Sequence, residues 1–246
     1  MKSVVWGAMM ALMLSGSAAA QTTGAPLDLS ALLPEGASSA SARIVQFVVL
    51  ITILSLAPGL LIMVTCFTRI IVALSFLRAG IGLQTTPANI VMISLALFMT
   101  FYIMGPTFDR AWSQGVQPLT QNEITEEEAF VLITDPFREF MLANVRERDL
   151  ELFADLSGVE PTADEAVELR VLIPAFMISE LRRGFEIGFL ILLPFLVIDL
   201  VVATLIMSMG MMMMPPTIIA LPFKVLFFVL IDGWNLLVGS LVRSFA

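Results

Sequence analysis

The stretch MSMGMMMMPP at residues 207–216 decides the fold of the last third of the chain, because it divides one long apolar region into two. A proline lacks a backbone N–H and pushes the preceding residue out of the helical region. We therefore predict two apolar helices, at about 185–209 and 217–241, that form a hairpin. Its turn is shaped by Gly210, Pro215 and Pro216, and its tip carries Met209, Met211, Met212, Met213 and Met214.

The residues alone allow three interpretations of this methionine tip. Methionine is unbranched and polarizable, so the tip can fill an irregular core or line a constriction that seals when empty and yields to cargo. Thioethers also bind Cu(I), but the chain has no histidine to complete a copper site. With Cys66 as the single cysteine, the common zinc and haem ligand sets are missing as well, and we expect no metal site and no cofactor.

The composition indicates an integral membrane protein. Hydrophobic residues make up 58% of the 246 and charged residues only 14%, unlike a typical soluble domain. The net charge of −8, with no basic patch, argues against a nucleic-acid partner. The chain has no G-x-S-x-G, H-E-x-x-H or phosphate-loop signature, so we do not expect an enzyme.

The start of the chain is typical of a secreted precursor. Lys2 precedes an apolar core that is too short to span a bilayer, and an A-x-A cleavage site ends at Ala20. We predict a cleavable signal peptide over residues 1–20 and a flexible periplasmic lead-in over residues 21–43. An uncleaved anchor is the alternative.

Residues 44–108 are predicted to form a first apolar helical hairpin. Ile44 to Cys66 is uncharged and long enough to cross a bilayer as a helix. Arg69 and Arg78 then flank a short apolar piece, and residues 79–108 are again uncharged. We therefore expect a helical hairpin whose turn carries both arginines, and the positive-inside rule places this turn on the cytoplasmic side.

Residues 109–180 are predicted to form an acidic insert of amphipathic helices on the periplasmic side. Acidic residues far outnumber basic ones there. T-x-x-E capping boxes at Thr125 and Thr162 indicate helix starts, and Pro136 after an aspartate suits the first turn of another helix. The acidity fits either a solvated spacer or a docking surface.

The second apolar hairpin, residues 181–246, contains two charges deep in apolar sequence, Asp199 and Lys224. If the turn runs from Met209 to Pro216, the helical rise places them at similar depths of about 15 and 12 Å. A charge inside a membrane costs roughly 2.5–3.5 kcal/mol on the insertion scale, so we expect an ion pair. The pair is either structural or involved in gating or proton coupling, and either within one hairpin or between neighbouring copies.

Arg182 and Arg183 conflict with the predicted topology. A chain that starts outside and crosses four times places them on the outer side, against the positive-inside rule. Either they are paired within the protein, with Glu180 and Glu186 close along the helix, or this hairpin is not an ordinary membrane span.

Four blocks of sequence are long enough to indicate relatives. They are PAFMISELRRGFEIGF at 174–189, LPFKVLFFVLIDGW at 221–234, CFTRIIVALSFLRAGIGLQTTPANIV at 66–91 and MMMMPP at 211–216. These blocks resemble the FliP family of flagellar biosynthetic proteins, which is shared with virulence type III secretion. With the leader and the insert, the resemblance covers nearly the whole chain, and the leader favours the flagellar branch.

The resemblance implies an all-α membrane protein in an oligomeric export gate. FliP-like proteins form a pentameric ring that, with FliQ and FliR, builds the gate of the flagellar basal body, at the bacterial inner membrane with a periplasmic portion. Other export-apparatus membrane proteins are further partners, and unfolded flagellar proteins are its cargo. The methionine loop seals the pore as a gasket, which maps onto Met209 to Met214.

In that family the gate lies largely above the membrane plane, which would explain the two misplaced arginines. The resemblance makes four charges candidates for contacts between subunits: Glu180, Arg182, Arg183 and Glu186. Two other classes of function stay open, namely a self-contained channel for ions or small solutes and a copper-handling membrane protein.

Overall fold

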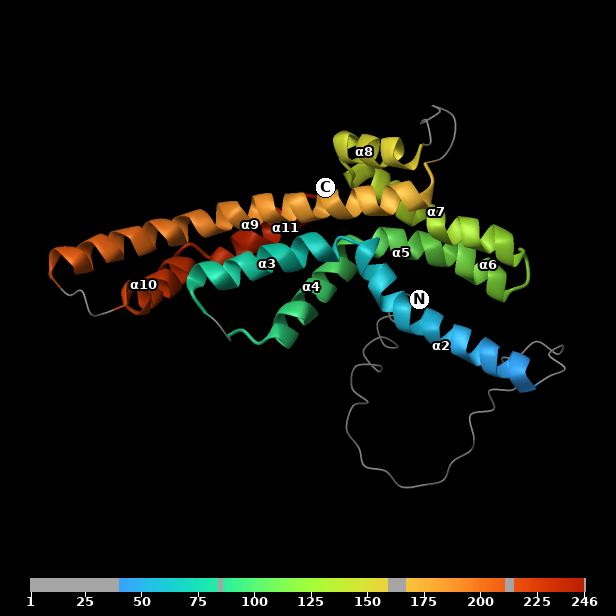
Figure 1. The fold of residues 1–246 in the computed structure, drawn as a ribbon, viewed down its shortest axis with the longest axis horizontal. Helices are drawn as coiled ribbons and strands as arrows, with labels where there is room; N and C mark the ends of the chain where they lie inside the picture. The colour runs from blue at the N-terminus through green and yellow to red at the C-terminus, as the bar shows by residue number, and fades with distance from the viewer. Residues whose placement is uncertain (1–39, 84–85, 159–166, 211–214, 246) are drawn as a thin grey trace, which may run out of the picture. The chain divides into compact units, whose positions relative to one another are not determined.

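The computed structural model describes residues 40–83, 86–158, 167–210 and 215–245, and all regular structure in these ranges is helical (Figure 1). The all-α prediction is confirmed for them. The chain divides into two compact parts, residues 1–52 and 53–246. Of the first part only the start of helix α2 (Ala40–Met63) is described, so the predicted signal peptide and most of the lead-in lie outside the described residues.

The second part of the chain is organised around one long helix, α9. In Figure 1, α3 and α10 lie along one side of α9, with α4 packed against α3, and α8 lies on the other side of α9. The helices in chain order are α3 (Phe67–Ile81), α4 (Asn89–Ile103), α5 (Gly105–Ala111), the π-helical turn η2 (Trp112–Val116), α6 (Gln117–Thr120), α7 (Glu126–Asn144), α8 (Glu147–Ser157), α9 (Leu169–Ser208), α10 (Pro216–Leu230) and α11 (Gly233–Arg243).

Helices α3 and α9 pack unusually closely because α9 presents two glycines to α3. A Cβ at Gly188 would lie 2.6 Å from the Phe76 ring, and one at Gly184 would lie 3.1 Å from Val72 Cβ. Small residues four apart let helix backbones approach each other in apolar surroundings. The main buried cluster extends from this contact to α4, α10 and α11 and includes Leu77 and Phe195.

Two described helices are long and apolar enough to cross a membrane, as judged by length and composition. They are α2, over Ile44–Met63, and α9. Two further pairs, α4 with residues 105–120 and α10 with α11, are each bent by 63°, and the total would be four if each pair were one span. Large apolar side chains are exposed on α4, α9 and α10, including Ile90, Leu200 and Val229. Such surfaces suit lipid or partner subunits better than water.

The predicted turn of the first hairpin is wrong, because Arg69 and Arg78 both lie on helix α3. The helix ends after them at Gly82, whose left-handed φ of 88° is readily adopted only by glycine. The segment between α2 and α4 is therefore a helix of its own that packs against α9. A charge that interrupts apolar sequence need not mark a turn, because arginine is a good helix former and can be paired inside the protein, as Arg69 is.

The second hairpin also differs from the prediction at both ends. Helix α9 begins at Leu169 rather than near residue 185, and it continues through Pro174 and Pro194. The predicted helix at 217–241 is two helices, because the chain bends between Leu230 and Gly233. Asp232 has a φ of 51° at this bend, a left-handed conformation that aspartate tolerates better than most residues.

The acidic insert contains α7 and α8. The capping box at Thr125 is confirmed: the Thr125 hydroxyl accepts a hydrogen bond from the Glu128 backbone N–H at 3.3 Å, and the Glu128 carboxylate accepts one from the Thr125 backbone N–H at 2.9 Å. The box at Thr162 lies outside the described residues. Pro136 does not start a helix but lies inside α7, where it is buried.

Candidate functional site

The predicted methionine turn begins where α9 ends at Ser208. Met209 is 72% exposed, and its backbone N–H donates to Leu205 O at 3.2 Å. Gly210 follows with a left-handed φ of 75°, which makes it the residue that turns the chain away from the helix axis. Met211, Met212, Met213 and Met214 lie outside the described residues.

Pro215 and Pro216 start the returning helix α10. Pro215 occupies the N-cap position in an extended conformation, and Pro216 is the first helical residue. A proline at the first helical position loses no hydrogen bond, because that N–H has no partner inside a helix. Gly210 therefore follows the end of α9, and the two prolines set the start of α10.

Asp199 and Lys224 form an ion pair within one chain. Lys224 Nζ lies 2.6 Å from Asp199 Oδ2, and the Lys224 side chain is 6% exposed against 32% for Asp199. The pair joins α9 to α10 on the helix arms of the methionine turn. Next to it, Val202 and Ile206 pack against Ala220.

Lys224 also reaches the end of a third helix. Its Nζ donates to Gly80 O at 2.9 Å, in the last turn of α3. Carbonyl groups at a helix C-terminus have no partner inside the helix, and the helix dipole favours a positive charge there. Gly80 also lets Phe195 of α9 pack closely against α3, since a Cβ at position 80 would lie 2.7 Å from the Phe195 ring. One lysine thus connects α3, α9 and α10.

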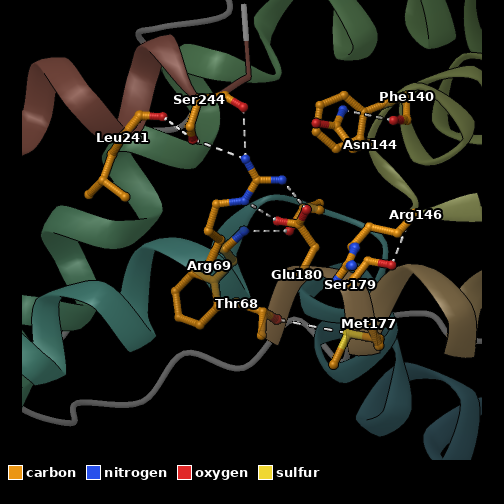
Figure 2. A network of polar contacts seen from close by, with 12 residues as sticks. Thr68, Arg69, Phe140, Asn144, Arg146, Met177, Ser179, Glu180, Leu241 and Ser244 are labelled. Atoms are coloured by element: carbon orange, nitrogen blue, oxygen red, sulfur yellow. Dashed lines mark hydrogen bonds and ion pairs between the residues drawn. The ribbon is translucent and has the colours of Figure 1, made fainter. Parts of the chain in front are cut away.

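A second ion pair, between Arg69 and Glu180, is completely buried. Both side chains are 0% exposed. Arg69 Nε donates to Glu180 Oε2 at 3.0 Å, and Arg69 Nη2 donates to Oε1 of the same carboxylate (Figure 2). This two-pronged geometry suits the planar guanidinium and links α3 to α9.

The rest of the Arg69 guanidinium binds the end of the chain. Arg69 Nη1 donates to Ser244 O at 2.9 Å and to Ser244 Oγ at 3.0 Å, as Figure 2 shows. Arg69 Cζ also lies 3.6 Å from the centre of the Phe245 ring. The residues after α11 are thereby attached to the interface between α3 and α9.

Ser179, beside Glu180, connects the acidic insert to α9. Its hydroxyl lies 2.7 Å from Asp149 Oδ2 and accepts a hydrogen bond from the Arg146 backbone N–H at 3.1 Å. Asp149 and Ser179 are both buried. Two consecutive residues of α9 therefore hold the insert on one side and α3 on the other (Figure 2).

The four charges proposed for contacts between subunits separate into two kinds. Glu180 is not available to a neighbour, because it is buried against Arg69. Arg182 pairs with Glu186 one turn further along α9, Nε to Oε1 3.0 Å, and both are about half exposed. Arg183 is partly exposed and forms no ion pair with a described residue.

Sequence reasoning missed two features of this site. The glycine pair of α9 was visible as a G-x-x-x-G pattern in an apolar segment, which is a known signal for close helix packing. Arg69 is the only charge between residues 67 and 77. Asp199 was selected because it is a charge within apolar sequence, and the same reasoning applies to Arg69. Nothing in the sequence indicates that Ser244 is its partner.

Comparison with known proteins decides the family. The FliP family model matches residues 50–241 of this chain. The chain belongs to the FliP family. A flagellar biosynthetic protein FliP from Rhizobium meliloti is 61% identical over 241 residues, which cover 97% of this chain and 96% of the relative.

Other members of the FliP family agree over most of their length. The relative from Agrobacterium fabrum is 63% identical over 210 residues, covering 84% of this chain and 86% of its own. The relative from Bacillus subtilis is 48% identical over 213 residues, which cover 86% of this chain and 95% of the relative. The resemblance inferred from the four sequence blocks is confirmed. As a FliP family member with membrane-capable helices, the chain is a membrane component of the flagellar export apparatus, with a transport role.

Proposed function

We propose that this chain is a core subunit of the flagellar type III export gate and forms, with further copies of itself, the pore through which unfolded flagellar proteins pass. In this proposal five copies make a ring that assembles with FliQ and FliR at the bacterial inner membrane, with a portion in the periplasm. Membership of the FliP family supports it. The exposed apolar faces of α4, α9 and α10 support it too, because they need lipid or partner subunits as neighbours.

The position of the methionine turn carries the gasket part of the proposal. The turn connects two helices that the Asp199–Lys224 pair and the Val202, Ile206 and Ala220 contacts hold together. Its described methionine, Met209, is largely exposed. A soft apolar tip on two fixed helices is what a seal needs, because thioether side chains adapt to a cargo of changing shape and close again afterwards.

Arg182, Arg183 and Glu186 are proposed to contact neighbouring subunits. They lie on the exposed part of α9, close to the buried Arg69–Glu180 pair that fixes this helix. A charge at the rim of an interface mainly sets orientation and partner choice.

The gasket is tested by changing Met211 to Met214 in the assembled complex and measuring ion conductance in a planar bilayer. Deletion of the four residues, or their replacement by four serines, should make the closed pore leak while assembly stays intact. Replacement by four leucines is the matched control, because it keeps the length and the apolar character, and it should leak less than the serine variant. Unchanged conductance after deletion would contradict the gasket.

The native mass of the purified complex tests the gate itself. Several copies of this chain together with two other small membrane proteins would support the proposal. A lone chain that conducts ions would support the alternative of a self-contained channel. A monomer with stoichiometric copper would support a copper-handling protein and refute the gate.

A further inference from the structure

A pocket lies between α3, α4, α10 and the start of α11, away from the methionine turn and from the Arg69 network. Its volume is about 210 Å³. Leu77 of α3, Val91 of α4, Val225 and Val229 of α10 and Trp234 of α11 line it. All four helices belong to the second part of the chain, so the pocket is a feature of one compact unit.

The described lining of this pocket combines one charged side chain with an apolar surface. Among the described lining residues Arg78 alone is charged, and the others are apolar apart from the indole N–H of Trp234. Arg78 Nη1 donates to Asn89 Oδ1, and Arg78 has no carboxylate partner among the described residues. A guanidinium presents five N–H donors, and the bond to Asn89 uses one of them, so Arg78 can also donate to an anion.

The surface around the pocket is apolar. Val91 is 55% exposed and Val229 is 69% exposed. Trp234 is 46% exposed, and its ring packs edge-on against Phe228 at 5.4 Å between centroids. A tryptophan with one apolar side and one polar N–H is common at the boundary between lipid and water.

We propose that this pocket binds an anionic phospholipid, with its phosphate on Arg78 and part of an acyl chain among the apolar lining residues. One end of the ligand must be a strong acceptor for guanidinium donors, and the remainder must be hydrocarbon. An anionic phospholipid has both properties, and its net charge complements the unmatched Arg78. The anionic leaflet of a bacterial membrane supplies such lipids beside any basic residue at its surface.

Neither the gasket nor the ring is needed for this binding. The lipid would contact α3, α4, α10 and α11 of one chain, whereas the gasket lies at the turn between the end of α9 and the start of α10. A bound lipid would fill the space between α4 and α10, which contact α3 on this side of the unit. Lipid binding and pore sealing can therefore fail separately in experiments.

Tryptophan fluorescence provides the test, because Trp234 lines the pocket. The other tryptophans, Trp6 and Trp112, are replaced by phenylalanine. The complex is reconstituted in nanodiscs of phosphatidylcholine that contain a small fraction of either brominated phosphatidylglycerol or brominated phosphatidylcholine. We expect Trp234 to be quenched by the anionic lipid at a roughly fivefold lower mole fraction, the preference expected from one basic residue near an anionic surface.

Three variants complete the test. Arg78→Gln should remove the preference, and Arg78→Lys should keep most of it because the charge remains. Arg170→Gln is the matched control, since Arg170 is exposed, pairs with Glu168 and lies outside the pocket, and it should leave the preference unchanged.

Several outcomes would overturn the proposal. Equal quenching by both lipids, or a preference that survives Arg78→Gln, would show that Arg78 selects no headgroup. Loss of the preference on addition of excess inorganic phosphate would show a site for free anions instead. No quenching by either lipid would show that a protein surface covers the pocket.

Discussion

Replacing Arg69 by methionine should destabilise the chain strongly. The substitution keeps a long side chain but removes the residue that forms the ion pair with the Glu180 carboxylate, which is 0% exposed. Removing one member of a buried ion pair costs about 3–5 kcal/mol, because the remaining charge stays desolvated. The variant also loses the hydrogen bonds to Ser244 and the contact with the Phe245 ring.

This loss should appear as a lower melting temperature of the purified chain in detergent, followed by circular dichroism. For a chain of this size about 1 kcal/mol corresponds to 2–4 °C, so the expected decrease is roughly 6–20 °C. Arg182→Met is the matched control, since the exposed Arg182–Glu186 pair is of a kind that contributes only about 0.3–0.5 kcal/mol.

The double variant Arg69→Met with Glu180→Leu provides the decisive comparison. Replacing a buried ion pair by apolar residues of similar volume is often close to neutral, so the double variant should recover much of the stability lost in Arg69→Met. If the two effects simply add, or if Arg69→Met lowers stability no more than Arg182→Met, the reasoning about this pair is wrong.

Three further predictions concern packing and ionisation. Gly188→Ala should push α3 away from α9, because the added Cβ would lie 2.6 Å from the Phe76 ring. The free energy of unfolding should fall by about 1–3 kcal/mol, which thermal unfolding measures. Burial raises the pKa of the Cys66 thiol to about 12 from an ordinary 9.0. Maleimide should therefore label the thiol of the native protein slowly at pH 8. The stability of the fold should fall as the pH rises from 9 toward 12, because the unfolded chain loses the thiol proton first. Hydrogen bonds from Thr125 lower the pKa of Glu128 below its ordinary 4.5. The ionised cap should therefore stabilise the fold above about pH 4.5, and this effect should be lost as the pH falls through the folded-state pKa. The difference in stability between wild type and Glu128→Gln, measured at several pH values, should shrink over the same range.

Each of these predictions has a control. Gly105→Ala should be tolerated far better than Gly188→Ala, since no atom lies within 4 Å of its added Cβ. Labelling of Cys66 should become fast in denaturant, and fast labelling of the native protein would show that the thiol is accessible. A Glu128→Gln effect that is the same at pH 3 and pH 7 would contradict the role given to the carboxylate.

Features that depend on a few neighbouring residues could be predicted from the sequence. The capping box at Thr125 was found because its partners are three residues apart, and the break before Pro215 was found because proline acts on its own backbone. The same local rule failed at Pro136, where α7 continues. Tertiary contacts around a buried proline can outweigh its local preference.

The charges of the candidate site were predictable only where they interrupt an apolar segment. Asp199 and Lys224 were expected at similar depth because a turn of known position lies between them, and the structure places them 2.6 Å apart. Glu180 was expected beside Arg182 and Arg183 on its own helix, yet its partner is Arg69, 111 residues away. Spacing along one helix cannot identify a partner on another helix.

The sequence by itself determined that the chain is helical and apolar, that it breaks after Ser208, and that it belongs with the FliP family. Composition, proline chemistry and long sequence blocks are properties of neighbouring residues, so they need no fold. Only the tertiary structure decided that Arg69 is buried on Glu180 and Ser244, and that Lys224 reaches Gly80 at the end of α3. These contacts join segments more than a hundred residues apart, and they form because the glycines of α9 allow α3 to approach closely enough for buried charges to find their partners.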